Sequence, residues 1–266
     1  MLDCFNRNID YLRISVTDRC NLRCTYCMPA EGVAMLNHND ILSFDEIAEI
    51  VHYGVEHGVR KVRLTGGEPL IRKGIVNLVS MLSAIRGLDD LSLTTNGILL
   101  PEMANDLRKA GLKRVNISLD TLDPEKFASI TRKGNVNDVL QGINAAIEAE
   151  LLPVKLNCVI SESSSEPDAL MVKQFASEKN IEVRFIHLMN LETGEFSQVE
   201  GGEGGYCNTC NRLRLTAHGL LKPCLFSNEG FSVRELGIAE AYRLALKNKP
   251  ESGSSSTSHN FYNIGG

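Results

Sequence analysis

Short apolar, β-branched runs alternate with amphipathic stretches from residue 11 to about residue 190. This alternation predicts parallel strands joined by crossover helices, and six such units are too few for a closed eight-stranded barrel. The clearest helix begins at Ser43, where Ser43 and Glu46 form a capping box, and it ends at Gly58. The other predicted helices cover 74–86, 101–110, 136–151, 166–179 and 234–249, and the predicted strands cover 11–17, 61–65, 91–95, 114–120, 154–160 and 182–188.

Three cysteines follow the first predicted strand directly. Cys20, Cys24 and Cys27 have the spacing C-x₃-C-x₂-C. Thiolates on so short a loop can hold three corners of a 4Fe-4S cluster. No fourth cysteine lies nearby in the sequence, so one iron would stay open to another ligand, as is typical of a catalytic site. A zinc knuckle and three buried free thiols are the alternatives.

A second group of cysteines follows a short, polar and glycine-rich stretch over 191–206. Cys207, Cys210 and Cys224 are spaced C-x₂-C-x₁₃-C. By spacing alone, a zinc site completed by His218 fits this group as well as a cluster does. The two remaining cysteines, Cys4 and Cys158, have no motif around them, and we assign them to packing or to the surface.

Polar residues gather where the predicted strands end. In parallel α/β folds the carboxyl ends of the strands meet at one edge, where functional groups collect. The sequence therefore predicts an active site at this edge. The polar groups after the second to sixth strands are Gly66-Gly67-Glu68-Pro69, Thr94-Thr95-Asn96-Gly97, Ser118 with Asp120, Lys155 with Asn157, and Arg184 followed by Met189.

Composition and charge narrow the functions that a chain of 266 residues can have. A hydrophobic content of 43% allows a large core, and a net charge of −5 argues against broad nucleic-acid binding. There is no run of about eighteen apolar residues and no apolar signal-peptide core, so we expect a cytoplasmic protein with no membrane span. Arg13 and Arg63 nevertheless lie inside strand patterns, where a charge is costly unless it faces a polar cavity. With Lys155, Arg212 and Arg214 they predict a local pocket for a phosphorylated anion.

The segment from Tyr11 to Pro29 resembles the signature of the radical S-adenosylmethionine (SAM) enzymes, and more specifically that of the GTP 3′,8-cyclase family of molybdenum cofactor biosynthesis. The resemblance implies an α/β fold, an open (β/α)₆ partial TIM barrel over residues 1–190. It also implies a small C-terminal domain over 191–266 that binds an auxiliary cluster and ends in a flexible Gly-Gly tail. The segment from Cys207 to Thr216 resembles the one that holds the second 4Fe-4S cluster of that family, whose open iron faces the purine base.

The resemblance also implies the reaction and its residues. SAM on the reduced first cluster gives a 5′-deoxyadenosyl radical, which takes the C3′ hydrogen of GTP, and C3′ then joins C8 to give 3′,8-cyclo-7,8-dihydro-GTP. By similarity, SAM would contact Tyr26, Gly67, Glu68, Ser118 and Met189. GTP would contact Arg13, Arg63, Thr94, Lys155, Arg212, Leu213 and Arg214, and catalysis would involve Arg212, Arg214, Gly265 and Gly266.

The implied partners are an electron donor of the flavodoxin or ferredoxin type and a downstream cyclic pyranopterin monophosphate synthase. A nucleic-acid partner is not expected, and a homodimer is possible. The sequence departs from the family in three places. His187 stands where a glutamate is usual, the stretch from Met189 to Cys207 is short, and the Ser-rich linker at 252–258 looks trimmed and flexible. The alternatives are therefore a radical SAM enzyme that modifies a peptide, and a paralogue that binds zinc or a cluster without turnover.

Overall fold

The computed structural model describes residues 1–257 and 261–264. Over these residues the strands form one sheet of nine, in the order β6-β5-β4-β3-β2-β1-β7-β8-β9. Strands β1 to β7 are parallel to one another, and β8 and β9 are added in antiparallel pairing at the edge formed by β7. The strands are β1 (Tyr11–Ser15), β2 (Lys61–Thr65), β3 (Asp90–Thr95), β4 (Arg114–Ser118), β5 (Lys155–Ile160), β6 (Glu182–His187), β7 (Arg212–Leu215), β8 (Leu220–Lys222) and β9 (Phe231–Ser232).

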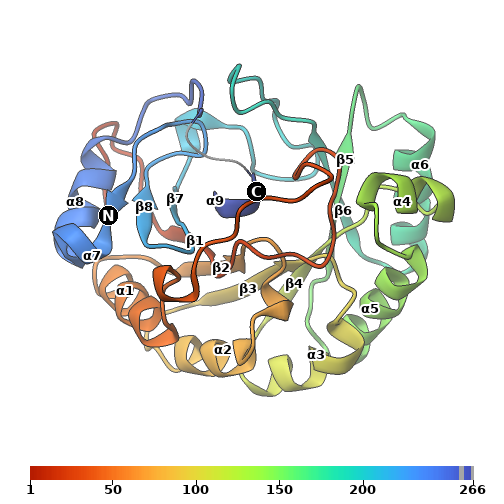
Figure 1. The fold of residues 1–266 in the computed structure, drawn as a ribbon, viewed down its shortest axis with the longest axis horizontal. Helices are drawn as coiled ribbons and strands as arrows, with labels where there is room; N and C mark the ends of the chain where they lie inside the picture. Colours follow the sequence, from red (N-terminus) through yellow and green to blue (C-terminus); the bar gives the residue numbers. More distant parts are fainter. Residues whose placement is uncertain (258–260, 265–266) are drawn as a thin grey trace.

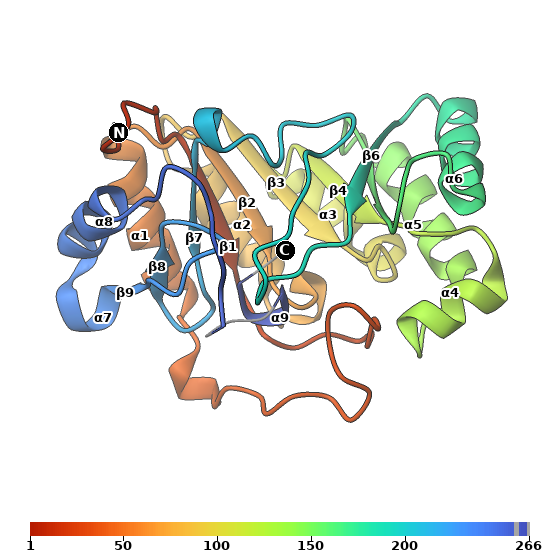
Figure 2. The ribbon, with the colours of Figure 1, turned by 90° about the horizontal axis from the view of Figure 1, so that it is seen from above.

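The sheet is curved, and the crossover helices cover its outer face (Figure 1). Seen from above, α7 and α8 flank one end of the sheet and α4, α5 and α6 flank the other (Figure 2). The edge strands β6 and β9 do not pair with each other among the described residues, so the predicted open barrel is confirmed. The helices are α1 (Phe44–Glu56), α2 (Ile75–Ser83), α3 (Leu100–Lys109), α4 (Pro124–Thr131), α5 (Val136–Glu148), α6 (Pro167–Glu178), α7 (Val233–Leu236), α8 (Ile238–Lys247) and α9 (Phe261–Ile264), with 3₁₀ turns η1 (His38–Asp40), η2 (Pro69–Ile71) and η3 (Cys207–Thr209).

Helix α1 forms as its sequence predicts. The Glu46 amide donates to Ser43 Oγ at 3.1 Å and the Ser43 amide donates to Glu46 Oε2 at 2.6 Å, which completes the capping box. Its apolar face, which includes Ile47 and Val51, is buried in the main core between the sheet and the helices. Local capping and one apolar face thus fix where this helix begins and how it packs.

Other predicted elements differ from the structure. The single helix expected over 234–249 is wrong, because Gly237 has φ +80° and separates α7 from α8. Helix α4 was not predicted, although the Asp123 side chain caps it by accepting from the Lys126 amide at 2.8 Å. The linker that composition marked as flexible makes defined contacts: the Ser254 amide donates to Phe226 O at 3.2 Å and the Ser256 amide donates to Leu191 O at 2.6 Å.

Helix α9 lies inside the curve of the sheet rather than on the outer surface (Figure 1). Ile264 is fully buried in a second, smaller apolar cluster with Leu191, Leu225 and Phe226. The last described residues are therefore anchored by burial of apolar surface. The predicted catalytic Gly265 and Gly266 lie outside the described residues. Within the described part of the chain, we find no helix with the length and apolar character that a membrane span needs.

Candidate active site

One cavity of about 750 Å³ lies inside the curve of the sheet and is lined by all six motif cysteines. The order of the strands explains this placement. Cys20, Cys24 and Cys27 follow the carboxyl end of β1, whereas Cys207 and Cys210 precede the amino end of β7, which pairs in parallel with β1. Because β8 is antiparallel to β7, Cys224 returns to that same end. The two cysteine triplets therefore lie at opposite ends of a shared cavity.

The first triplet lies in surroundings that disfavour thiolates unless a cation is present. Burial, and then the negative charge of Asp120, raises the pKa of Cys24 to about 12, and burial raises the pKa of Cys27 to about 12. The metal-free cysteines are therefore neutral thiols, and they would become thiolate ligands only next to positive charge such as that of bound iron. Next to them, Tyr26 donates its hydroxyl proton to Asp120 Oδ2 at 2.8 Å, which fixes the ring at the cavity wall.

The Gly66-Gly67-Glu68 turn after β2 packs directly against the cysteine loop. A Cβ at Gly67 would lie 2.2 Å from the carbonyl oxygen of Arg19, so only glycine fits at this position. The Glu68 side chain is 1% exposed and accepts from the Leu70 amide, the Thr95 hydroxyl and the Asn96 amide at 3.0, 2.8 and 2.7 Å. Burial raises the pKa of Glu68 to about 7. A buried carboxyl group next to the exposed backbone groups of a glycine turn is suited to bind the amino group of an amino acid.

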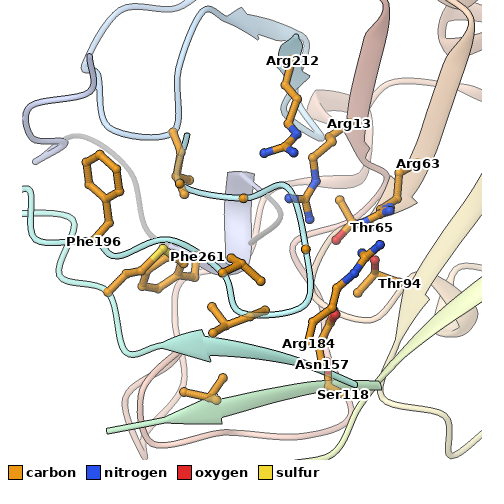
Figure 3. A pocket seen from close by; sticks show the side chains of 18 of the residues that line it. Arg13, Arg63, Thr65, Thr94, Ser118, Asn157, Arg184, Phe196, Arg212 and Phe261 are labelled. Atoms are coloured by element: carbon orange, nitrogen blue, oxygen red, sulfur yellow. The ribbon is translucent and has the colours of Figure 1, made fainter. Parts of the chain in front are cut away.

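A row of arginines crosses three neighbouring strands. Arg63 on β2 is level with Arg13 on β1, and Arg13 is level with Arg214 on β7. Burial, and then repulsion from Arg214, lowers the pKa of Arg13, and burial followed by repulsion from Arg212 lowers the pKa of Arg214 to about 10. The side chains of Arg13, Arg63 and Arg212 reach toward one space in Figure 3. Buried like charges of this kind are stabilised by a polyanion.

Arg184 is a cavity residue that the sequence analysis placed at the rim without giving it a role. Its side chain extends from β6 toward Arg63 and Thr94 (Figure 3). Among the described residues, Arg184 Nε and Thr94 Oγ1 are buried and have no hydrogen-bond partner, so both can bind a ligand. The argument used for Arg13, a charge inside a strand pattern, would have identified Arg184 as well. Further lining residues that no motif indicated are Lys61, Thr65, Arg114, Phe196 and Phe261.

Most of the residues that sequence similarity assigned to ligands line this cavity: Tyr26, Gly67, Glu68, Ser118 and Met189 for SAM, and Arg13, Arg63, Thr94, Lys155, Arg212 and Arg214 for GTP. Leu213 differs, because its side chain is 1% exposed and belongs to the main core, so only its backbone is left for a ligand contact. Lys155 forms an ion pair with Glu182, and His187 forms one with Glu200, at 3.5 Å between Nε2 and Oε1. Cys158 is buried in the main core, while the exposed Cys4 donates its thiol proton to Lys247 O.

The second triplet does not include His218. Arg214 pairs with Lys222 across the β7–β8 hairpin, so Cys210 and Cys224 lie at its open end and His218 lies in the turn at the other end. Among the described residues, no three His, Cys, Asp or Glu side chains are gathered as ligands of a single ion. The thiolates of a 4Fe-4S cluster each bind a different iron atom, so a cluster does not require that grouping.

The open parallel sheet, the cysteine loop after β1 and the Gly-Gly-Glu turn after β2 together define a radical SAM enzyme, and such enzymes use a 4Fe-4S cluster with SAM. Residues 14–172 match the family model of the Radical SAM superfamily, and residues 172–254 match the Molybdenum Cofactor Synthesis C model. The chain belongs to the GTP 3′,8-cyclase family.

The relatives that establish the family cover nearly the whole chain. The GTP 3′,8-cyclase of Petrotoga mobilis is 40% identical over 98% of this chain and 95% of its own length, and that of Moorella thermoacetica is 45% identical over 94% of each. The Petrotoga alignment runs over 314 residues, more than the 266 of this chain, so it contains gaps here.

Solved structures at low sequence identity share the fold. SuiB of Streptococcus suis bound to S-adenosylmethionine is 15% identical, with a TM-score of 0.63 over 90% of this chain and 65% of that one. The protein anSMEcpe with bound AdoMet and the Kp18Cys peptide is 14% identical, with a TM-score of 0.60 over 95% of this chain and 93% of that one. These likenesses support the open barrel of the radical SAM superfamily.

Proposed function

We propose that this chain is a GTP 3′,8-cyclase, which converts GTP to 3′,8-cyclo-7,8-dihydro-GTP in the first step of molybdenum cofactor biosynthesis. The observation that carries the proposal is that one cavity has a cysteine triplet at each end and a row of buried arginines between them. The curated relatives that cover nearly the whole chain carry the same activity in their names.

The first end of the cavity binds the cluster and SAM. Cys20, Cys24 and Cys27 hold the cluster, and Glu68 accepts a hydrogen bond from the methionyl amino group, with Tyr26 placed by Asp120. Gly67, Ser118 and Met189 complete the SAM contacts. When bound, the cluster and SAM supply a 5′-deoxyadenosyl radical. The protein itself contributes orientation and exclusion of water.

The arginine row binds the substrate. The triphosphate accepts hydrogen bonds from the side chains of Arg13, Arg63, Thr94, Lys155, Arg212 and Arg214. Each charged hydrogen bond contributes roughly 1.5–3 kcal/mol to the binding free energy. Lys155 lines the cavity, and its ammonium forms an ion pair with Glu182 that a phosphate would partly replace.

The second end of the cavity faces the base. Cys207, Cys210 and Cys224 hold a second 4Fe-4S cluster beside the purine, and Arg212 and Arg214 orient the nucleotide between the two clusters. We also assign the last two glycines, Gly265 and Gly266, to catalysis on the ground of the family resemblance; the described residue before them, Ile264, is buried with Leu191, Leu225 and Phe226.

The cellular setting follows from this chemistry. Two clusters with open iron atoms require a reducing cytoplasm and an electron donor of the flavodoxin or ferredoxin type. The cyclic product passes to a cyclic pyranopterin monophosphate synthase. The homodimer stays a prediction that sedimentation measurements can test.

The deciding experiment is anaerobic reconstitution of the protein with iron and sulfide, followed by SAM and a reductant with and without GTP. We expect about eight iron atoms per chain, and 5′-deoxyadenosine formation that rises when GTP is added. Arg63→Met should remove the dependence on GTP, whereas Arg108→Met, on the exposed side of α3, should not. If 5′-deoxyadenosine does not rise with GTP, the cyclase proposal is wrong, and a rise with a peptide instead would identify the peptide-modifying alternative.

A further inference from the structure

Lys249 is a buried cation at the second cysteine triplet that the proposed function does not use. The residue follows α8 and is 3% exposed. Its ammonium donates to the carbonyl oxygens of Arg212 at 2.7 Å and Pro223 at 2.8 Å, and to Cys210 Sγ at 3.5 Å. Pro223 directly precedes Cys224, so a single side chain contacts the sulfur of Cys210 and the carbonyl group that precedes Cys224.

A second buried cation, Arg7, holds the third cysteine. Its Nη1 donates to the carbonyl oxygens of Cys207 at 2.7 Å and Glu251 at 2.9 Å, and its Nη2 donates to Pro250 O at 2.6 Å. Its Nε pairs with the buried Asp3 at 2.6 Å. The N-terminal turn and the segment Lys249-Pro250-Glu251 are therefore locked together around the triplet.

The charges in this region do not balance without the cysteines. Asp3 pairs with Arg7, whereas the contacts of Lys249 among the described residues are two carbonyl oxygens and one sulfur. A buried ammonium needs a counter-charge, because its desolvation is costly. The cysteine thiolates are therefore the nearest source of the missing negative charge.

We propose that Lys249 is a positioning residue of the second cluster, which donates a charged hydrogen bond to the Cys210 ligand and supplies the counter-charge of the triplet, with Arg7 fixing the Cys207 backbone. The inference rests on the proposed second cluster. A positive charge and a hydrogen bond at a ligand sulfur make an iron–sulfur cluster easier to reduce. Lys249 thus tunes the potential of this cluster through its hydrogen bond to Cys210.

The test uses a parent protein in which Cys20, Cys24 and Cys27 are replaced by alanine, so that only the second triplet binds a cluster. Lys249→Met, Lys249→Gln and Lys249→Arg are compared in this parent, and Lys247→Met, an exposed lysine two positions earlier, is the matched control. The measurements are iron per chain and the midpoint potential from a titration followed by electron paramagnetic resonance.

In Lys249→Met, we expect the equilibrium constant for reduction of the cluster to fall about tenfold, which lowers the midpoint potential by about 59 mV for one electron. A loss of most of the iron from this variant would support the proposal equally. Lys249→Gln keeps a donor without the charge and should show the same direction of change, which preserves the test if the methionine variant does not fold. Lys249→Arg should stay near the parent. If Lys249→Gln has the same iron content and potential as Lys247→Met, the proposal for Lys249 is refuted. If the parent binds no 4Fe-4S cluster, the second-cluster assignment falls with it, independently of whether SAM cleavage depends on GTP in the intact enzyme.

Discussion

Gly67→Ala tests how the first cysteine loop is held in place. The added Cβ would lie 2.2 Å from Arg19 O and 2.6 Å from the Arg19 carbonyl carbon, both of which are backbone atoms that cannot rotate away. Relieving the overlap needs about 1 Å of separation between the two loops. Two hydrogen bonds of 2.8 Å join these loops, from the Gly67 amide to Thr17 O and from the Glu68 amide to Arg19 O, and this separation would break both.

The expected loss is about 2–4 kcal/mol of unfolding free energy, from two broken hydrogen bonds and the overpacking strain. Cys20 directly follows Arg19, so the variant should also bind less iron at the first triplet. Gly230→Ala is the matched control, because a Cβ there would have its nearest neighbours at an ordinary 3.4 Å. The assays are urea denaturation of the metal-free proteins and iron content after reconstitution. Equal stability and equal iron content in the two variants would refute the argument.

Three further predictions concern the two ends of the cavity. Cys24→Ala should abolish SAM cleavage, whereas Cys207→Ala should spare much of it and block product, and equal loss of 5′-deoxyadenosine in both would contradict the division of roles. Burial raises the pKa of Glu68 from an ordinary 4.5 to about 7, so the metal-free protein should lose up to about 3 kcal/mol of unfolding free energy as the pH rises through this window. Urea denaturation across pH 4.5–8 should show a weaker pH dependence for Glu68→Gln. An unchanged pH dependence in this variant would contradict the role given to Glu68. Arg214→Met should weaken GTP binding at least tenfold, measured by calorimetry, with SAM binding unchanged, and a parallel loss of SAM binding would exclude a role confined to the nucleotide.

Helix α1 and the convergence of polar residues at the strand ends could be predicted from sequence because their determinants are local, whereas helix α4 was missed. The capping box at Ser43 and the apolar face of α1 are within one helix, and polar residues at strand ends converge in any parallel sheet. The break between α7 and α8 could not be predicted, because helices often tolerate a glycine and the sequence does not show whether Gly237 ends one. The observed φ of +80° at Gly237 shows that it does.

The parts that sequence could not predict depend on contacts between distant segments. Lys249 lies 39 residues from Cys210, and no local pattern connects them. Arg7 meets Glu251 across nearly the whole chain. The linker after α8 has a composition typical of flexible segments, but Ser256 pairs with Leu191. Such pairings are set by which surfaces meet in the folded chain, and composition carries no information about them.

Residues 190–206, the short segment before Cys207, form one wall of the cavity, and two contacts hold this segment in place. The amide of Phe185 on β6 donates to Glu200 O and the Glu200 amide donates to Phe185 O, both at 3.0 Å, so the segment adds a backbone bridge to the edge of the sheet. A Cβ at Gly201 would lie 2.6 Å from the carbonyl oxygen of Val183, so the glycine allows this close approach. Phe196 stacks on Phe226 with ring centroids 4.6 Å apart and places the segment over the second apolar cluster.

This arrangement explains how the segment can be short and still form a wall of the site. Phe196, Gly201 and Gly202 all line the cavity, so residues fixed by the bridge and the stacked rings lie beside the arginine row. The bridge uses backbone atoms of the edge strand, and the aromatic pair buries apolar surface. The wall of the cavity beside the arginine row therefore depends on the backbone bridge and on the stacked rings.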